Sequence, residues 1–119
     1  HEVLTVVFLD AAHAVIDATV VAEGTVTVNT IYPRELVKAA LARNASALVI
    51  AHNHPSGSLT PSRQDSELTR SLYLVCSFMH LDLLDHLIIG AGDQVYSFAD
   101  QGLMATIRED CRRLLGRSG

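Results

Sequence analysis

The segment from Ala51 to Asp65, AHNHPSGSLTPSRQD, contains the residues of this chain that are best suited to chemistry. His52 and His54 are separated by one residue, and Ser62 and Asp65 follow after a Pro-Ser-Gly turn. Imidazole nitrogens and carboxylate oxygens are common zinc ligands, and three protein ligands leave a position for water, as in catalytic zinc sites. The spacing therefore predicts a metal site formed by His52, His54 and Asp65.

A buried strand is needed to bring the two histidines together. Residues 47–51 form a short, apolar and partly β-branched run, which is typical of such a strand. Side chains two residues apart on a strand point to the same side. We therefore expect His52 and His54 to project together from the end of the strand, while Asn53 faces away.

A helix is needed to bring Asp65 to the histidines. Thr60 and Pro61 are typical of a helix start, with threonine as the N-cap and proline at the first helical position. Asp65 continues the apolar stripe of this helix, so its carboxylate faces the interior and needs a partner. The stripe consists of Leu68, Leu72, Val75, Cys76 and Met79. A divalent cation shared with the two imidazoles would satisfy the carboxylate.

Simpler interpretations exist for each residue taken singly. A histidine beside an apolar run is usually structural, and Ser62 with Asp65 fits a variant capping box, in which Asp replaces the usual Glu or Gln. The joint spacing favours the metal site. A metallo-β-lactamase-like site would need an Asp-His pair where Ser56 and Gly57 stand, and a cupin would need a glutamate before Glu67. HNH nucleases have their three residues widely spaced rather than consecutive.

Length and composition predict one domain, residues 1–119, that can bury a core. The hydrophobic fraction is 49%, but no apolar run approaches the ~20 residues that span a membrane, so we expect no membrane partner. No signal peptide is visible. Cys76 and Cys111 fall on predicted helices and are expected to be reduced packing residues, which fits a cytoplasmic location.

The charge distribution leaves two interpretations open. The net charge of −4 argues against a large nucleic-acid-binding surface. However, basic residues cluster near the C-terminus: Arg108, Arg112, Arg113 and Arg117. They fit a solvated last helix whose cations suit its dipole. They also fit contact with an acidic partner or nucleic acid.

The remaining pattern predicts a mixed β-sheet with helices packed on it, an α/β fold. Strands are expected at residues 3–9, 14–21, 47–51, 83–89 and 95–98, and a further strand-like segment follows Gly24 at 25–30. Helices are expected from Pro33 to a stop at Asn44, from 61 to about 80, and from 102 to 115.

The apolar strand 83–89 contains two polar residues, Asp85 and His86, whose side chains should face opposite sides of the sheet. Polar groups in an apolar strand need hydrogen-bond partners, so a structural role is the first interpretation for both. Contact with a metal ligand or the substrate is the alternative for His86.

The pattern resembles a known family. His52-x-His54-Pro55 followed by Ser62-x-x-Asp65 is similar to the JAMM (MPN+) metalloprotease signature, which also includes a glutamate on an upstream strand. From Glu2 to about residue 103 the chain resembles the JAMM-like domain of the bacterial RadC family. The segments that carry this resemblance are FLD at 8–10, YPRELV at 32–37, AHNHPSG at 51–57, TPSRQD at 60–65, LLDHLIIG at 83–90 and SFADQGL at 97–103.

The resemblance implies a cytidine-deaminase-like α/β/α sandwich in which the three predicted ligands bind zinc. It implies that Ser62 hydrogen-bonds the metal-bound water or the oxyanion. The upstream glutamate has two candidates, Glu2 and Glu23. We prefer Glu2, because it begins the first core strand, where the family pattern has its glutamate.

The activity implied by the resemblance is zinc-dependent hydrolysis of a peptide or isopeptide bond in an unknown protein or peptide. Glu2 would pass a proton from water to the leaving amine, and Ser62 would stabilise the oxyanion. Longer members of the family carry an N-terminal helix-hairpin-helix segment, which looks like a nucleic-acid-binding element, and we do not expect it in this chain. A metal-bearing, non-hydrolytic interaction module for DNA repair is the alternative function. Nucleic-acid hydrolysis at the same zinc is disfavoured by the acidic charge balance, and the oligomeric state stays open.

Overall fold

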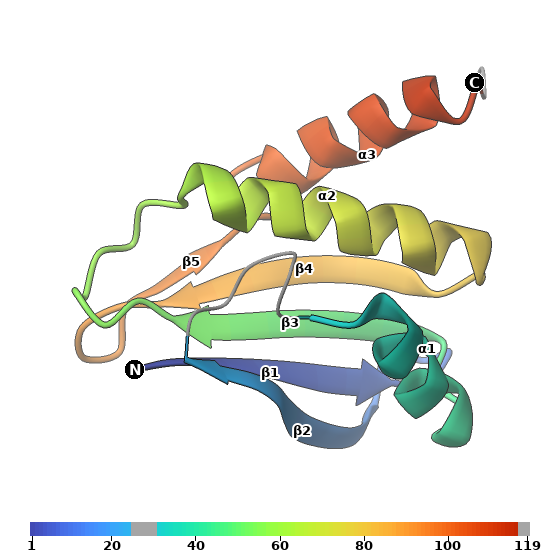
Figure 1. Ribbon diagram of the computed structural model, residues 1–119, viewed down its shortest axis with the longest axis horizontal. Helices are drawn as coiled ribbons and strands as arrows, with labels where there is room; N and C mark the ends of the chain where they lie inside the picture. Colours follow the sequence, from blue (N-terminus) through green and yellow to red (C-terminus); the bar gives the residue numbers. More distant parts are fainter. Residues whose placement is uncertain (25–30, 117–119) are drawn as a thin grey trace.

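The computed structural model describes residues 1–24 and 31–116, which form a five-stranded sheet with three helices (Figure 1). The strands are β1 (Glu2–Leu9), β2 (Val15–Gly24), β3 (Ala47–Asn53), β4 (Asp82–Ile89) and β5 (Val95–Ser97). The helices are α1 (Pro33–Ala42), α2 (Arg63–Phe78) and α3 (Leu103–Leu114). The predicted α/β fold class, a mixed sheet with helices packed on it, is confirmed. The second helical layer of an α/β/α sandwich is not seen among the described residues, because all three helices pack on the face that carries the core. The strand-like segment expected at 25–30 lies outside the described residues.

The sheet is mixed, and its strand order is β2-β1-β3-β4-β5. β1 is antiparallel to β2 and β3, β3 is parallel to β4, and β4 is antiparallel to β5. The parallel pair requires a crossover connection, which α2 provides. The ends of β3 and β4 and the beginning of β1 therefore lie at the same end of the sheet, as Figure 1 shows.

The helices pack against one face of the sheet. Alternating side chains of the central strands supply this face, and they meet one side of α1 and of α2. The core includes Leu4, Val6, Phe8, Leu48 and Ile50 from the sheet, Leu36 and Ala40 from α1, and Leu68, Leu72 and Cys76 from α2. A second cluster, Ile88, Phe98, Met104, Ile107 and Cys111, attaches α3. Cys76 and Cys111 are free and buried, which confirms them as packing residues.

The predicted start of α2 is wrong by two residues. Ser62, rather than Thr60, is the N-cap, and the helix begins at Arg63. The Ser62 hydroxyl accepts from the backbone N–H of Asp65, and the Asp65 carboxylate accepts from the N–H of Ser62. This capping box satisfies two backbone donors that Thr60 would leave unpaired. Met79, at the other end, is the C-cap and is 42% exposed, so it lies outside the buried stripe.

None of the helices found in residues 1–24 and 31–116 is long and apolar enough to cross a bilayer.

The loop after β3 packs closely on Gly90 at the end of β4. A Cβ atom at this position would lie 2.9 Å from the carbonyl oxygen of Gly57 and 2.6 Å from Cδ2 of Leu59. The leucine side chain can rotate away, but the carbonyl belongs to the backbone of the loop. Because Gly90 has no side chain, the loop that follows His54 can lie directly against the sheet.

Gly90→Ala should lower the free energy of unfolding by about 1 to 3 kcal/mol, because the added methyl group overpacks against this backbone. Denaturant or thermal unfolding measures the change. Gln94→Ala, at an exposed position in the same turn, is the control and should change stability by less than about 0.5 kcal/mol. Unchanged stability of Gly90→Ala would contradict the close contact.

Candidate metal centre

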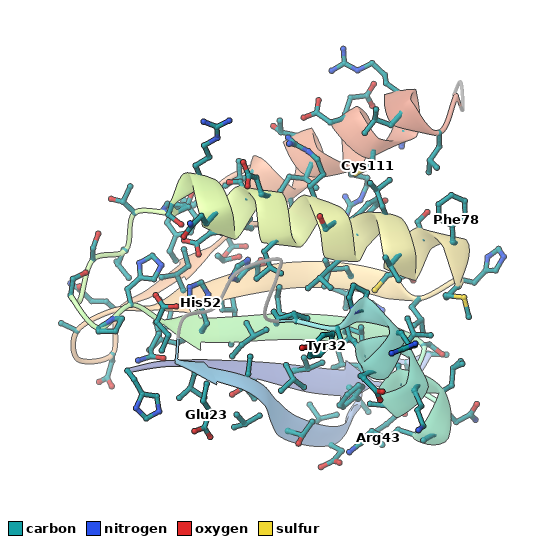
Figure 2. All side chains as sticks on the ribbon, viewed as in Figure 1. Glu23, Tyr32, Arg43, His52, Phe78 and Cys111 are labelled. Atoms are coloured by element: carbon teal, nitrogen blue, oxygen red, sulfur yellow. The ribbon has the colours of Figure 1, made fainter. Side chains whose placement is uncertain are left out.

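His52 lies near the end of β3 (Figure 2) and is 2% exposed. Strand alternation places it on the same side as Ile50, facing the helices. Its Nε2 atom lies 3.1 Å from Oδ1 of Asp65, and its Nδ1 atom lies 2.8 Å from Nε2 of His86. Both ring nitrogens therefore have protein contacts.

His54 directly follows β3 but is still held by β4, because its backbone N–H donates to the carbonyl of Ile89 over 3.1 Å. Its Nδ1 atom lies 3.0 Å from the carbonyl oxygen of Ser58. Its Nε2 atom lies 3.0 Å from Oδ2 of Asp65. The predicted projection of both histidines toward one carboxylate is thus observed.

Asp65 occupies the first turn of α2 and is 5% exposed. Burial alone raises the pKa of its carboxyl group, but the contact with His52 and the backbone N–H of Ser62 lower it more. The net effect holds the pKa well below its ordinary value, so the carboxylate is ionised. The capping box and the histidine cluster, which the sequence presented as alternatives, use the same side chain.

The hydrogen bonds of His54 test whether a cation fits between these groups. A carbonyl oxygen only accepts, so the contact with Ser58 requires a proton on Nδ1 of His54. Nε2 is then the ring nitrogen that faces the ionised carboxylate, 3.0 Å away. Two facing acceptors are unfavourable, so this contact needs a positive charge, either a proton on Nε2 or a metal cation between the two atoms.

The spacing of the three ligands also suits zinc. The ligand atoms of His52, His54 and Asp65 all lie within 4.8 Å of one another. Neighbouring ligand atoms around a tetrahedral zinc are about 3.3 to 3.6 Å apart, given bonds of about 2.0 to 2.2 Å. The observed contacts of 3.0 and 3.1 Å need only small adjustments to reach this range.

Strand register distinguishes the two candidate glutamates. Leu4 pairs with His52, and Val3 pairs with Glu23. Because side chains alternate along β1, Glu2 shares the face of Leu4 and His52, whereas Glu23 shares the opposite face with Val3. The Glu23 side chain is 64% exposed and lies at the β2 edge of the sheet (Figure 2). Of the two, Glu2 is the residue on the face that carries the cluster.

Asn53 holds the backbone on both sides of Glu2, a role that the sequence did not indicate. Its Oδ1 atom accepts from the N–H of Val3 over 2.7 Å, and its Nδ2 atom donates to the carbonyl of His1 over 3.0 Å. Asn53 does face away from His52, as predicted. From that side it fixes the start of β1 beside the end of β3.

His86 contacts the cluster from β4 and is completely buried. Its Nδ1 atom lies 2.6 Å from the hydroxyl oxygen of Thr69, and Nε2 contacts His52. Burial, followed by the nearby His52, lowers the pKa of His86 to about 3, so the ring is neutral. This contact with a predicted ligand matches the alternative interpretation of His86. Thr69 was not predicted; its signal is a polar residue four positions after Asp65, on the buried side of α2.

Asp85 has the structural role that was the first interpretation for it. It accepts from the hydroxyl of Ser97 over 2.5 Å and from the backbone N–H of Ala99 over 2.9 Å. Both partners follow β4 in the chain, so Asp85 fastens the β5 hairpin rather than the metal centre.

The basic cluster lies on α3, and two of its members are ion-paired within the helix. Arg112 lies 3.2 Å from Glu109, and Arg113 lies 3.0 Å from Asp110. These pairs fit the interpretation of a solvated helix. Arg117 lies outside the described residues, and a nucleic-acid partner stays a prediction.

Comparison with known proteins identifies the family. A family model described as the RadC-like JAB domain matches residues 1–103. The chain belongs to this family. The chain is 49% identical over 104 residues to a UPF0758 protein of Aromatoleum aromaticum, covering 87% of this chain and 46% of that protein. A UPF0758 protein of Symbiobacterium thermophilum is 46% identical over 99 residues, which cover 83% of this chain and 42% of that protein. The chain thus spans less than half the length of these relatives.

The RadC-like JAB domain should bind one zinc ion per chain, and His52→Ala or His54→Ala should abolish stoichiometric binding, because each removes one of three ligands. Elemental analysis after dialysis measures the metal content. His80→Asn is the matched control: His80 is exposed and outside the cluster, and its φ of 55° is one that asparagine tolerates. Equal zinc content in all four proteins would contradict the site.

Proposed function

We propose that this domain is a zinc-dependent hydrolase that cleaves a peptide or isopeptide bond. The observation that carries the proposal is the convergence of two imidazoles and one ionised carboxylate in a domain of the JAB family. Within residues 1–24 and 31–116 this is the one group of its kind, which favours single-metal hydrolysis over two-metal phosphodiester chemistry.

Each ligand is held by contacts with the protein itself. His52 is packed in the core, His54 is fastened to Ser58, and Asp65 is fixed by the helix cap. A zinc ion bound by them would supply a Lewis acid that polarises the scissile carbonyl and activates water near neutral pH. Such a held ligand set lowers the cost of ordering the site on binding.

Glu2 is proposed as the general base that takes a proton from water and passes it to the leaving amine. Two observations support this role. The alternation of β1 directs Glu2 to the face of His52, and Asn53 fixes the backbone at His1 and Val3 on either side of it.

Ser62 is proposed to stabilise the oxyanion that forms when the carbonyl is attacked. In the capping box its oxygen accepts from the N–H of Asp65, so this bond uses a lone pair and not the hydroxyl proton. That proton can be donated to the developing negative charge. The N-terminus of α2, where Ser62 stands, also favours negative charge.

The proposal is tested with the zinc-loaded domain and panels of fluorogenic peptides and isopeptide-linked substrates. Hydrolysis should stop on addition of a chelator and return with zinc. Cleavage that a chelator leaves unchanged, or zinc-loaded protein that cleaves none of these substrates, would count against the proposal.

Glu2→Gln should lower kcat by about 10²- to 10⁴-fold, because the amide cannot accept the proton, while zinc content stays at one ion per chain. Glu23→Gln is the matched control, since Glu23 lies on the other face of the sheet, and it should retain the wild-type rate. A Glu2→Gln protein with normal turnover would remove Glu2 from the mechanism.

Ser62→Gly separates the two functions of the serine. Glycine is a tolerated N-cap, so stability should fall by only a few tenths of a kcal/mol. The loss of the hydroxyl should still lower kcat by about 10²- to 10³-fold. Thermal unfolding and initial rates measure the two effects, and a normal rate would mean that Ser62 only caps the helix.

A further inference from the structure

We propose that Thr69 and His86 are positioning residues that fix the tautomer of His52, so that its Nε2 lone pair is directed at the metal. The inference deepens the proposed function because it concerns a ligand of the same site, but it requires only metal binding and not hydrolysis. It rests on three consecutive contacts that begin at the carbonyl of Asp65: 2.7 Å to Thr69 Oγ1, then 2.6 Å to His86 Nδ1, then 2.8 Å from His86 Nε2 to His52 Nδ1.

The direction of the first bond is fixed by chemistry. A backbone carbonyl only accepts, so the single hydroxyl proton of Thr69 points to the carbonyl of Asp65. Toward His86, the same hydroxyl can then only accept. Nδ1 of His86 must therefore carry a proton.

The second bond follows from the burial of His86. The ring is 0% exposed and stacks on Phe98 with centroids 4.5 Å apart, and its two nitrogens contact Thr69 and His52. A charged imidazolium here would be buried without a carboxylate on either nitrogen, which is very costly. The ring is therefore neutral and carries one proton, on Nδ1, so its Nε2 atom is an acceptor.

The third bond then sets the state of His52. Because Nε2 of His86 accepts, Nδ1 of His52 must donate, which leaves Nε2 as the ring nitrogen of His52 that can bind a metal. This atom lies 3.1 Å from Oδ1 of Asp65. The opposite tautomer would place a proton on Nε2, which would have to be released before a metal could bind.

In both predicted histidine ligands, a hydrogen bond from Nδ1 to a protein acceptor leaves Nε2 to face the metal site. Ser58 holds the proton of His54 on Nδ1 through a backbone carbonyl, and His86 does so for His52 through a side chain. The carbonyl that starts the chain of bonds belongs to Asp65, the third ligand, so the backbone of one ligand orients the ring of another. Partners of this kind typically change metal affinity by 10- to 100-fold.

Thr69→Val tests the inference, because valine keeps the shape of threonine and removes the hydroxyl. The Kd for zinc, measured by competition with a chromogenic chelator, should rise about 10- to 100-fold. Thr69→Ser, which restores the hydroxyl, should stay within a few-fold of wild type. Thr106→Val is a matched control on α3, where an exposed threonine makes the same bond to a helical carbonyl four residues earlier. An unchanged Kd in Thr69→Val would overturn the inference.

Long-range ¹H–¹⁵N NMR of the metal-free wild-type protein tests the tautomers without any substitution. His52 should carry a proton on Nδ1, and His86 should carry a proton on Nδ1 and none on Nε2. A His52 ring without a proton on Nδ1 would overturn the inference even if Thr69→Val failed to fold. Neither experiment uses turnover, so a domain with this tautomer and no hydrolysis would contradict only the proposed function.

Discussion

A buried carboxylate at the beginning of α2 is the constraint on which the rest of the site depends. Asp65 is ionised and 5% exposed, and an anion in that position is costly unless several groups compensate it. The backbone N–H of Ser62 and the N-terminal end of the helix supply part of this compensation. Two imidazoles supply the rest, through protons that they donate to the carboxylate or through a metal cation that they share with it. The fold therefore builds a place for positive charge beside Asp65.

The mixed topology explains how four separate segments meet at this end of the sheet. Because β3 is parallel to β4 on one side and antiparallel to β1 on the other, the end of β3 meets both the end of β4 and the beginning of β1. His52 and His54 come from the end of β3, and Glu2 comes from the beginning of β1. The crossover helix α2 must return over the sheet to join β3 to β4, and its first turn brings Asp65 to the same place. An all-parallel sheet would put the start of β1 at the opposite end.

The parts of the site that depend on local pattern could be predicted from the sequence. Two-residue alternation paired His52 with His54, and helical spacing turned Asp65 inward. The role of Asn53 could not be predicted, because its partners, Val3 and His1, are about fifty positions away and meet it only through strand register. Thr69 was missed for a similar reason, since its partner His86 is reached across the helix–sheet interface. The start of α2 was misplaced because proline at 61 is a strong local signal, whereas the reciprocal bonds of Ser62 and Asp65 depend on the geometry of both.

The capping box and the metal site are not competing explanations, because one carboxylate has enough lone pairs for both. Oδ2 accepts from the backbone of Ser62 while also facing His54, and Oδ1 faces His52. The capping bonds fix the rotamer of Asp65, and in this rotamer the carboxylate also faces His52 and His54. Metal binding then stabilises a helix terminus that is already formed, and loss of the cap would loosen a metal ligand. The same bonds that begin α2 therefore also orient a ligand of the site.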